Sequence, residues 1–95
     1  MRHVGLRFSR DPAKAASNLR KHGISFAEAE TAFGDPLSVS VPDPDHSDDE
    51  DRQLLIGETE LGRVVVVAFT ERNEIIRIIN ARPADRLERR EYEEG

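Results

Sequence analysis

The stretch RVVVVAFTERNEIIRIINAR, residues 63–82, contains two apolar runs separated by a short polar turn. The first run, Arg63–Thr70, is apolar on both faces, which is typical of a central strand in a sheet. A turn at Arg72–Asn73 leads into Ile75–Arg82, which predicts a second strand. Because so short a connection joins antiparallel neighbours, these residues predict a buried hairpin.

Two further strands are predicted before this hairpin. Arg52–Glu58 has the composition of a strand, and Leu61–Gly62 marks the turn that follows it. Leu37–Val41 alternates apolar and polar residues as a short strand. With the hairpin, these segments predict an antiparallel meander of four strands.

The N-terminal part predicts one strand and one helix. Arg2–Phe8 alternates in the manner of a half-buried strand. Asp11 is a favourable N-cap, and Pro12 suits the first helical turn because its missing N–H needs no partner there. Gly23 supplies the left-handed residue that ends this helix.

Two more helices are predicted. Ser25 and Glu28 have the spacing of a capping box, and Gly34–Pro36 ends the helix that they begin. After Pro83, the highly charged segment Asp85–Glu94 predicts a C-terminal helix with only Leu87 and Tyr92 to bury.

Residues 1–95 therefore predict a single α+β domain with the element order β-α-α-β-β-β-β-α and an antiparallel sheet. The two N-terminal helices are expected on one face of the sheet, where Leu19, Phe26 and Phe33 bury their side chains. The opposite face is left partly open and can hold a functional site.

Composition limits the class of protein. There is no cysteine, which excludes a disulfide framework and fits a reducing cytoplasm. Met1–Phe8 is too short and too charged for a signal peptide, and the longest apolar run, Val64–Phe69, is far below the roughly 20 residues of a membrane helix. We therefore expect a cytoplasmic protein without membrane contact.

Charge is distributed unevenly along the chain. The formal net charge is −5, which by itself argues against a polyanionic partner. However, six of the Lys and Arg residues lie within Met1–His22, where Asp11 is the one acid, and six acids lie within Asp43–Asp51. A polyanion responds to such local patches, so the net charge is a poor guide to the partner.

The acidic segment Pro42–Asp51 also contains His46, which raises the question of a metal site with Asp43, Asp45 and Asp48. The spacing required for a calcium-binding loop is absent. Two prolines and a run of like charges favour a solvated loop without regular structure. We therefore expect neither a metal nor a cofactor.

Basic residues at two places are candidates for binding phosphate. Arg20, Lys21 and His22 share the last turn of the first helix, where they either compensate the helix dipole or face a phosphate. Arg77 interrupts a run of isoleucines, so it either faces the open side of the sheet or pairs with a carboxylate. Arg82 ends that strand beside Asn80.

Arg52 begins its strand directly after the acidic segment. It is either paired with Asp49 or Glu50 at the surface or available to a ligand. Without metal or nucleotide, a cluster of Lys, Arg and His can act on an RNA phosphodiester. That reaction needs a proton acceptor, a proton donor and cations around the developing negative charge. Arginine suits the last role because its planar fork binds phosphate through two hydrogen bonds.

Several blocks together resemble the BrnT toxins, over nearly the whole chain. The opening blocks are Phe8 with Asp11-Pro12-x-Lys14, Asn18-Leu19-x-Lys21-His22-Gly23-Ile24-Ser25-Phe26, Glu28-Ala29 and Phe33-x-Asp35-Pro36. The later blocks are Arg52-x3-Ile56-Gly57, Val66–Thr70 with Glu71-Arg72, Ile76-Arg77-Ile78-Ile79-x-Ala81-Arg82 and Arg86-x-Glu88-Arg89-Arg90-x-Tyr92. Where family members commonly carry a Trp before the Asp-Pro pair, this chain has Arg10.

The resemblance implies a RelE-like fold and a metal-independent endoribonuclease, the toxin of a type II toxin–antitoxin pair. It also implies an antitoxin partner of the BrnA type, with a ribbon-helix-helix part through which the complex binds DNA. By motif, the functional positions are Lys21, Arg52, Arg77 and Arg82, with His22 as the adjacent candidate for proton transfer. The alternative is a catalytically weak binding module of the same fold that acts with its antitoxin in DNA-binding autorepression.

Overall fold

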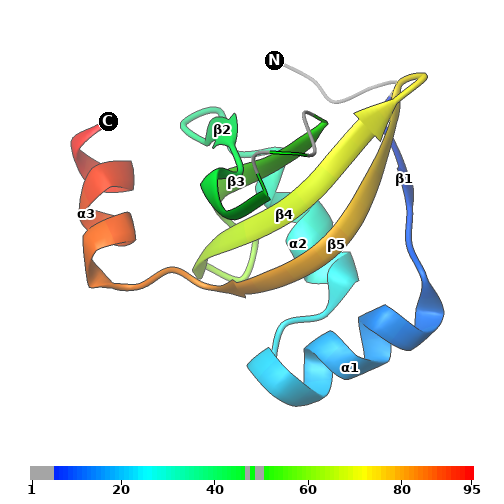
Figure 1. Ribbon diagram of the computed structural model, residues 1–95. Helices are drawn as coiled ribbons and strands as arrows, with labels where there is room; N and C mark the ends of the chain where they lie inside the picture. Colours follow the sequence, from blue (N-terminus) through cyan, green and yellow to red (C-terminus); the bar gives the residue numbers. More distant parts are fainter. Residues whose placement is uncertain (1–5, 47, 49–50) are drawn as a thin grey trace.

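The structure is a computed structural model that describes residues 6–46, 48 and 51–95. Its elements are β1 (Arg7–Ser9), α1 (Pro12–His22), α2 (Phe26–Ala32), β2 (Val39–Pro42), the short 3-10 helix η1 (Pro44–His46), β3 (Arg52–Glu58), β4 (Val64–Arg72), β5 (Ile75–Pro83) and α3 (Arg86–Glu94). This confirms the α+β class and the predicted order of helices and strands (Figure 1). Residues 2–5 of the predicted first strand lie outside the described residues.

The five strands form one sheet in the order β1-β5-β4-β3-β2. Strands β2 to β5 pair antiparallel, as predicted for the meander. Strand β1 joins the edge beside β5 and runs parallel to it, so the sheet is mixed and the expectation of an antiparallel sheet fails at this edge. A parallel pair is possible because the chain between β1 and β5 is long enough to cross over.

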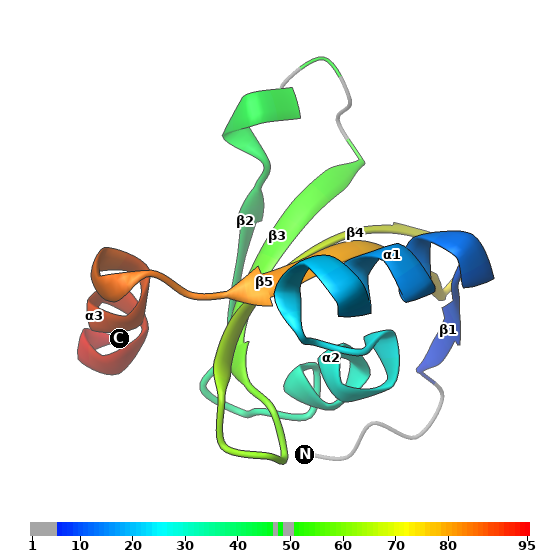
Figure 2. The same cartoon turned by 90° about the horizontal axis from the view of Figure 1, so that it is seen from below.

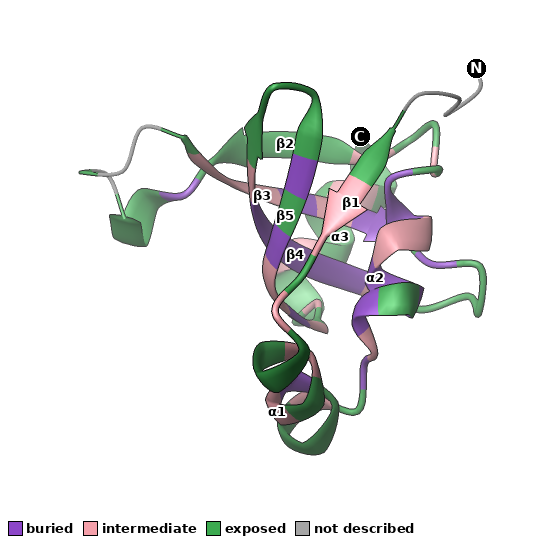
Figure 3. Cartoon of the chain, turned by 90° about the vertical axis from the view of Figure 1, so that its right-hand side faces the viewer, coloured by how far each residue is buried: buried purple, intermediate pink, exposed green. Residues whose placement is uncertain are grey.

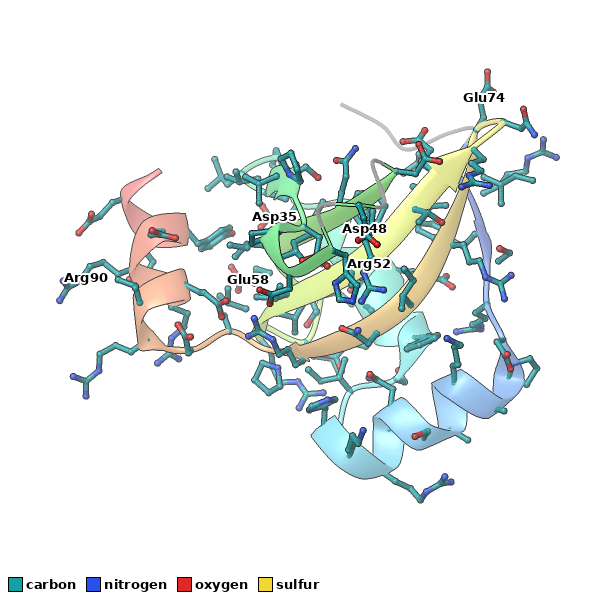
Figure 4. The ribbon with its side chains drawn as sticks, in the orientation of Figure 1. Asp35, Asp48, Arg52, Glu58, Glu74 and Arg90 are labelled. Carbon is teal, nitrogen blue, oxygen red and sulfur yellow. The ribbon has the colours of Figure 1, made fainter. Side chains whose placement is uncertain are left out.

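The hairpin between β4 and β5 turns at Asn73 and Glu74, and Figure 4 shows Glu74 at its tip. Both residues have positive φ angles, 54° and 65°. Two central residues with positive φ form the kind of turn whose twist matches that of the flanking strands. A turn between the two strands is therefore confirmed, but it lies one residue later than the predicted Arg72–Asn73, because Arg72 still pairs with Ile75.

The core lies between the sheet and α2. Strand β4 is its most buried strand (Figure 3). The core residues are Ile24, Phe26, Ala29, Ala32, Phe33, Leu55, Val65, Val67, Phe69, Ile76, Ile78 and Ala81. Phe26 and Phe33 are buried as predicted, and Phe33 contacts Phe8 and Phe69 edge to face.

The prediction that Leu19 belongs to the core is wrong, because its side chain is 50% exposed. Helix α1 packs along β5 and is largely exposed, so it contributes little apolar area (Figures 2 and 3). The buried residue of α1 is Asn18. Its Nδ2 donates to the carbonyls of Ile24 (2.9 Å) and Ala81 (2.8 Å), and its Oδ1 accepts from the Ala81 N–H (3.0 Å). A buried amide therefore fastens α1 to the sheet.

The capping box predicted for α2 forms only in part. Ser25 Oγ accepts from the Glu28 N–H (2.9 Å), but the Glu28 carboxylate is buried away from the helix end. It accepts from the Arg63 guanidinium and from Thr59 Oγ1 (2.7 Å). The Arg63 hydrogen bond outweighs burial and lowers the pKa of Glu28. This carboxylate therefore ties α2 to the loop between β3 and β4.

Helix α3 stands away from the sheet in Figures 1 and 2. The capping box of this helix is complete, with Asp85 accepting from the Glu88 N–H (2.8 Å) and Glu88 accepting from the Asp85 N–H (2.9 Å). Leu87 is 63% exposed, so the expectation that it is buried is wrong. The helix is attached through polar contacts instead, among them the Tyr92 hydroxyl, which donates to Asp35 Oδ2. No helix in the described part of the chain is long and apolar enough to cross a membrane.

Tyr92 is expected to report the attachment of α3 in an alkaline titration. Its hydrogen bond to Asp35, together with burial, raises its pKa to about 12. Because the folded pKa lies above the unfolded one, the bond stabilises the fold fully below pH of about 10, and this is lost as pH rises through about 12. Tyr92 is the sole tyrosine, and the chain has no tryptophan, so phenolate absorbance measures this group alone.

Unfolding the chain in urea should return the midpoint of that titration to about 10. Asp35→Asn should lower the midpoint in the folded chain, whereas Glu94→Gln, at the exposed end of α3, should leave it unchanged. A midpoint near 10 for the folded natural chain would contradict the hydrogen bond.

Candidate functional site

A groove of about 540 Å³ lies where α1 meets β5 and the start of β3. We call it the basic groove. Its lining residues are Lys14, Ser17, Asn18, Lys21, His22, Arg52, Ile79, Asn80 and Arg82. Four of the five predicted site residues therefore share one hollow: Lys21, His22, Arg52 and Arg82. They come from a helix end and two strands that are distant in the sequence.

Strand pairing explains how the arginines of β3 and β5 reach one face of the sheet. Thr70 of β4 lies between Arg52 of β3 and Arg77 of β5 in a cross-strand row. Residues alternate along β4, and its core residues, such as Phe69, face α2. The row through Thr70 therefore lies on the opposite, open face, where Figure 4 shows Arg52 in front of the sheet and α2 behind it.

A β-bulge brings Arg82 to the same face. Phe69 pairs with Ile78 and Ala68 pairs with Asn80, so Ile79 has no partner opposite it. Without this extra residue, strand alternation would place Arg77 and Arg82 on opposite faces. With it, Arg82 faces the open side while Ala81 remains in the core.

Arg77 lies outside the basic groove. It is exposed on the open face and lines a smaller hollow of about 260 Å³ with Ser9, Thr70, Arg72 and Ile75. No ion pair joins it to another described residue. Of the two predicted alternatives, the structure therefore supports the open face over a carboxylate partner.

Arg52 is held by Asp43, which was not among its expected partners. Its Nε donates to Asp43 Oδ2 at 2.9 Å, and the two side chains are 18% and 5% exposed. Burial raises the pKa of Asp43, but hydrogen bonds from the Asp45 N–H and Arg52 outweigh it, and the pKa lies below its usual range. Asp49 and Glu50, the partners considered from the sequence, lie outside the described residues.

Arg82 is held by Glu88 of α3. Its two terminal nitrogens donate to the two carboxylate oxygens, each at 2.7 Å. This contact raises the pKa of Arg82 and lowers that of Glu88. Arg82 is therefore fixed in place, but part of its charge is compensated.

Lys21 and His22 occupy the last turn of α1, which ends at Gly23 with a φ of 71°. Among the described residues, neither side chain forms an ion pair. Their position also suits compensation of the helix dipole, so the two interpretations of this cluster are compatible. Lys21 therefore offers the basic groove a charge that no described carboxylate neutralises.

A second hollow of about 540 Å³ lies on another part of the surface, against α2 and β1. Its apolar residues are Leu6, Phe8 and Phe33, and its acids are Glu30, Asp35, Glu58 and Glu60. Such a rim repels a polyanion. The size of the two hollows therefore does not distinguish them, but their charge does.

Two sequence expectations concern positions outside the basic groove. Arg10, at the position of the family tryptophan, is exposed and lies 3.6 Å from the carboxylate of Glu30. Within residues 6–46, 48 and 51–95, no group of three or more His, Cys, Asp or Glu side chains is arranged to hold a metal ion. The loop expected around His46 is not wholly irregular, because it contains the short helix η1, and Asp43, directly before η1, is buried.

Some residues that line the basic groove were not predicted, although the sequence contains a signal for them. Lys14, Asn18 and Lys21 follow one another at the spacing of one helical face, which was a usable signal. Asp43 and Glu88, the carboxylates that hold the groove arginines, lacked such a signal. Their roles depend on contacts with Arg52 of β3 and Arg82 of β5, which the sequence alone does not reveal.

Comparison with known proteins gives a consistent result. Residues 11–88 match the family model described as "Ribonuclease toxin, BrnT, of type II toxin-antitoxin system". No curated protein matches the sequence. The fold resembles the crystal structure of the Brucella abortus ribonuclease toxin BrnT, with 25% identity, a TM-score of 0.67 and coverage of 85% of this chain and 99% of that one. The chain therefore belongs to the BrnT family of ribonuclease toxins of type II toxin–antitoxin systems.

Proposed function

We propose that this chain is an endoribonuclease that cleaves RNA without a metal ion and is neutralised by a BrnA-type antitoxin. The observation that carries the proposal is the basic groove, in which Lys21, His22, Arg52 and Arg82 line one hollow. Three cations and a histidine around one space meet the needs of phosphodiester cleavage. Membership of the BrnT family supports the same reaction.

The reaction uses the 2′-hydroxyl of the RNA as the nucleophile. As its oxygen bonds to the adjacent phosphorus, the hydroxyl proton passes to a base, and the bond from phosphorus to the 5′-oxygen breaks. An acid supplies a proton to that leaving oxygen. The products are a 2′,3′-cyclic phosphate and a 5′-hydroxyl, and no water or metal is consumed.

Each groove residue has a role in this scheme. Lys21, Arg52 and Arg82 bind the phosphate and stabilise the charge that grows on its oxygens. His22 or Lys21 transfers protons. Arg77, on the same face two strands from Arg52, binds the RNA backbone where it leaves the groove.

The antitoxin that we propose carries a ribbon-helix-helix part. The complex binds DNA through that part, since the toxin surface itself is used for RNA. Because RNA and an antitoxin are the proposed substrate and partner, we propose that the protein acts in the cytoplasm.

Producing the chain without its antitoxin should arrest bacterial growth and cleave cellular RNA, and co-production of the antitoxin should restore both. Growth curves and RNA gels measure the two effects. A Lys21→Ala chain at equal abundance is the control and should be far less toxic. Normal growth with intact RNA and abundant soluble protein would refute the proposal.

One observation favours a second candidate, a catalytically weak binding module that acts with its antitoxin in autorepression. Two of the groove cations, Arg52 and Arg82, are already paired with carboxylates. If toxicity is absent, or is unchanged by Lys21→Ala and Arg77→Ala in folded protein, this second function is favoured.

A further inference from the structure

The acidic segment contains one carboxylate that is buried. Asp43 is 5% exposed, whereas Asp45, Asp48 and Asp51 of the same segment are exposed. An ionised carboxylate is costly to bury unless hydrogen bonds compensate it. Asp43 therefore has a structural or chemical role that its neighbours lack.

Within residues 6–46, 48 and 51–95, three donors surround the two oxygens of Asp43. Oδ1 accepts from the Asp45 N–H at 3.0 Å. Oδ2 contacts both Arg52 Nε at 2.9 Å and His46 Nδ1 at 3.2 Å. Because both nitrogens contact the same oxygen, they lie within about 6 Å of each other. The carboxylate thus joins a histidine to an arginine of the basic groove.

Backbone hydrogen bonds fix this arrangement. The Asp43 N–H donates to the Arg52 carbonyl at 3.1 Å, which closes the segment onto the start of β3. The His46 N–H donates to the Asp43 carbonyl at 3.2 Å, which forms η1. His46 is therefore held in place twice, by its backbone N–H on the Asp43 carbonyl and by its ring nitrogen on the Asp43 carboxylate.

The contact with Asp43 also fixes the tautomer of His46. An ionised carboxylate only accepts hydrogen bonds, so Nδ1 carries the hydrogen that faces it. In the neutral ring, Nε2 is then the nitrogen with a free lone pair. The side chain is 46% exposed, so the ring is open to solvent.

We propose that His46 is a second proton-transfer residue of the nuclease and that Asp43 is the positioning residue that orients both His46 and Arg52. The proposal rests on the proposed function, because RNA cleavage needs both an acceptor and a donor of protons. His22 or Lys21 of α1 provides one of these two proton-transfer functions, and His46 of η1 provides the other. In the part of the chain that the structure describes, the His46 ring contacts Asp43, beyond which lies Arg52, and the exposed acids Asp45 and Asp48 lie on the same segment.

The test is the pH dependence of cleavage of a short RNA oligonucleotide by purified, full-length chain. The natural chain should give a bell-shaped profile of kcat. His46→Ala should lower kcat at least about 100-fold with little change in KM and should remove one limb of the profile. Added imidazole should restore part of the activity of His46→Gly, which a purely structural role would not predict.

Asp43→Asn should retain both limbs but lower kcat about 10-fold, because the amide no longer holds Arg52 and His46 with a charge. Asp45→Asn removes the same charge from an exposed neighbour and should have no effect. Thermal unfolding of each variant separates misfolding from lost chemistry.

An active natural chain whose His46→Ala variant is equally active and keeps both limbs would overturn the proposal alone. A natural chain that does not cleave RNA would overturn the proposed function and this proposal together.

Discussion

Lys21→Ala is expected to lower kcat/KM for RNA cleavage about 100-fold, since removing a single group that stabilises developing charge typically costs this much. Lys21 lines the basic groove, and no described carboxylate pairs with it. Arg52 and Arg82 are compensated by Asp43 and Glu88. Lys21 therefore contributes to the groove a positive charge that no described carboxylate compensates.

Steady-state cleavage of a labelled RNA oligonucleotide measures this effect. Arg20→Ala is the matched control, because Arg20 is the exposed neighbour of Lys21 on α1 but does not line the groove. It should change kcat/KM less than about threefold, the size of a surface electrostatic effect. Equal losses in the two variants would mean that only the general charge of α1 matters and would contradict the role of Lys21.

Asn18→Ala is expected to reduce the free energy of unfolding by about 3 kcal/mol. The substitution removes three buried hydrogen bonds and leaves the Ala81 N–H and two carbonyls without their partner. Each such group costs about 1–3 kcal/mol when it is buried and unpaired. For a domain with a total stability of about 5–15 kcal/mol, this is a large fraction.

Urea denaturation followed by circular dichroism measures this loss. The matched control is Leu19→Ala, the next residue on the same helix, whose side chain is half exposed. It should cost less than about 1 kcal/mol although it removes more apolar surface. If Leu19→Ala destabilises the chain more than Asn18→Ala, then α1 is held by apolar packing rather than by the amide.

The order of the elements was predictable because it depends on local signals. The apolar runs of residues 63–82, the caps at Asp11 and Ser25 and the stop at Gly23 act within a few residues of the chain. Leu19 and Leu87 were misjudged for one reason. Helices α1 and α3 are fastened by hydrogen bonds and ion pairs rather than by an apolar stripe, and such contacts depend on partners distant in the sequence.

The candidate site was predictable as a set of residues but not as an arrangement. The blocks with Lys21 and Arg77 indicated where positive charge gathers. Strand alternation, however, would place Arg77 and Arg82 on opposite faces, and only the bulge at Ile79 brings them to one face. No residue in Ile75–Arg82 marks that bulge, because its position follows from the pairing with β4.

The most direct test of the central claim is cleavage of RNA by the purified chain in the presence of a strong chelator. The RNA should be cut at an undiminished rate, and its fragments should carry 2′,3′-cyclic phosphate ends. DNA of the same sequence should stay intact because it lacks the 2′-hydroxyl. Intact RNA, or cleavage that the chelator abolishes, would contradict metal-independent cleavage by this chain.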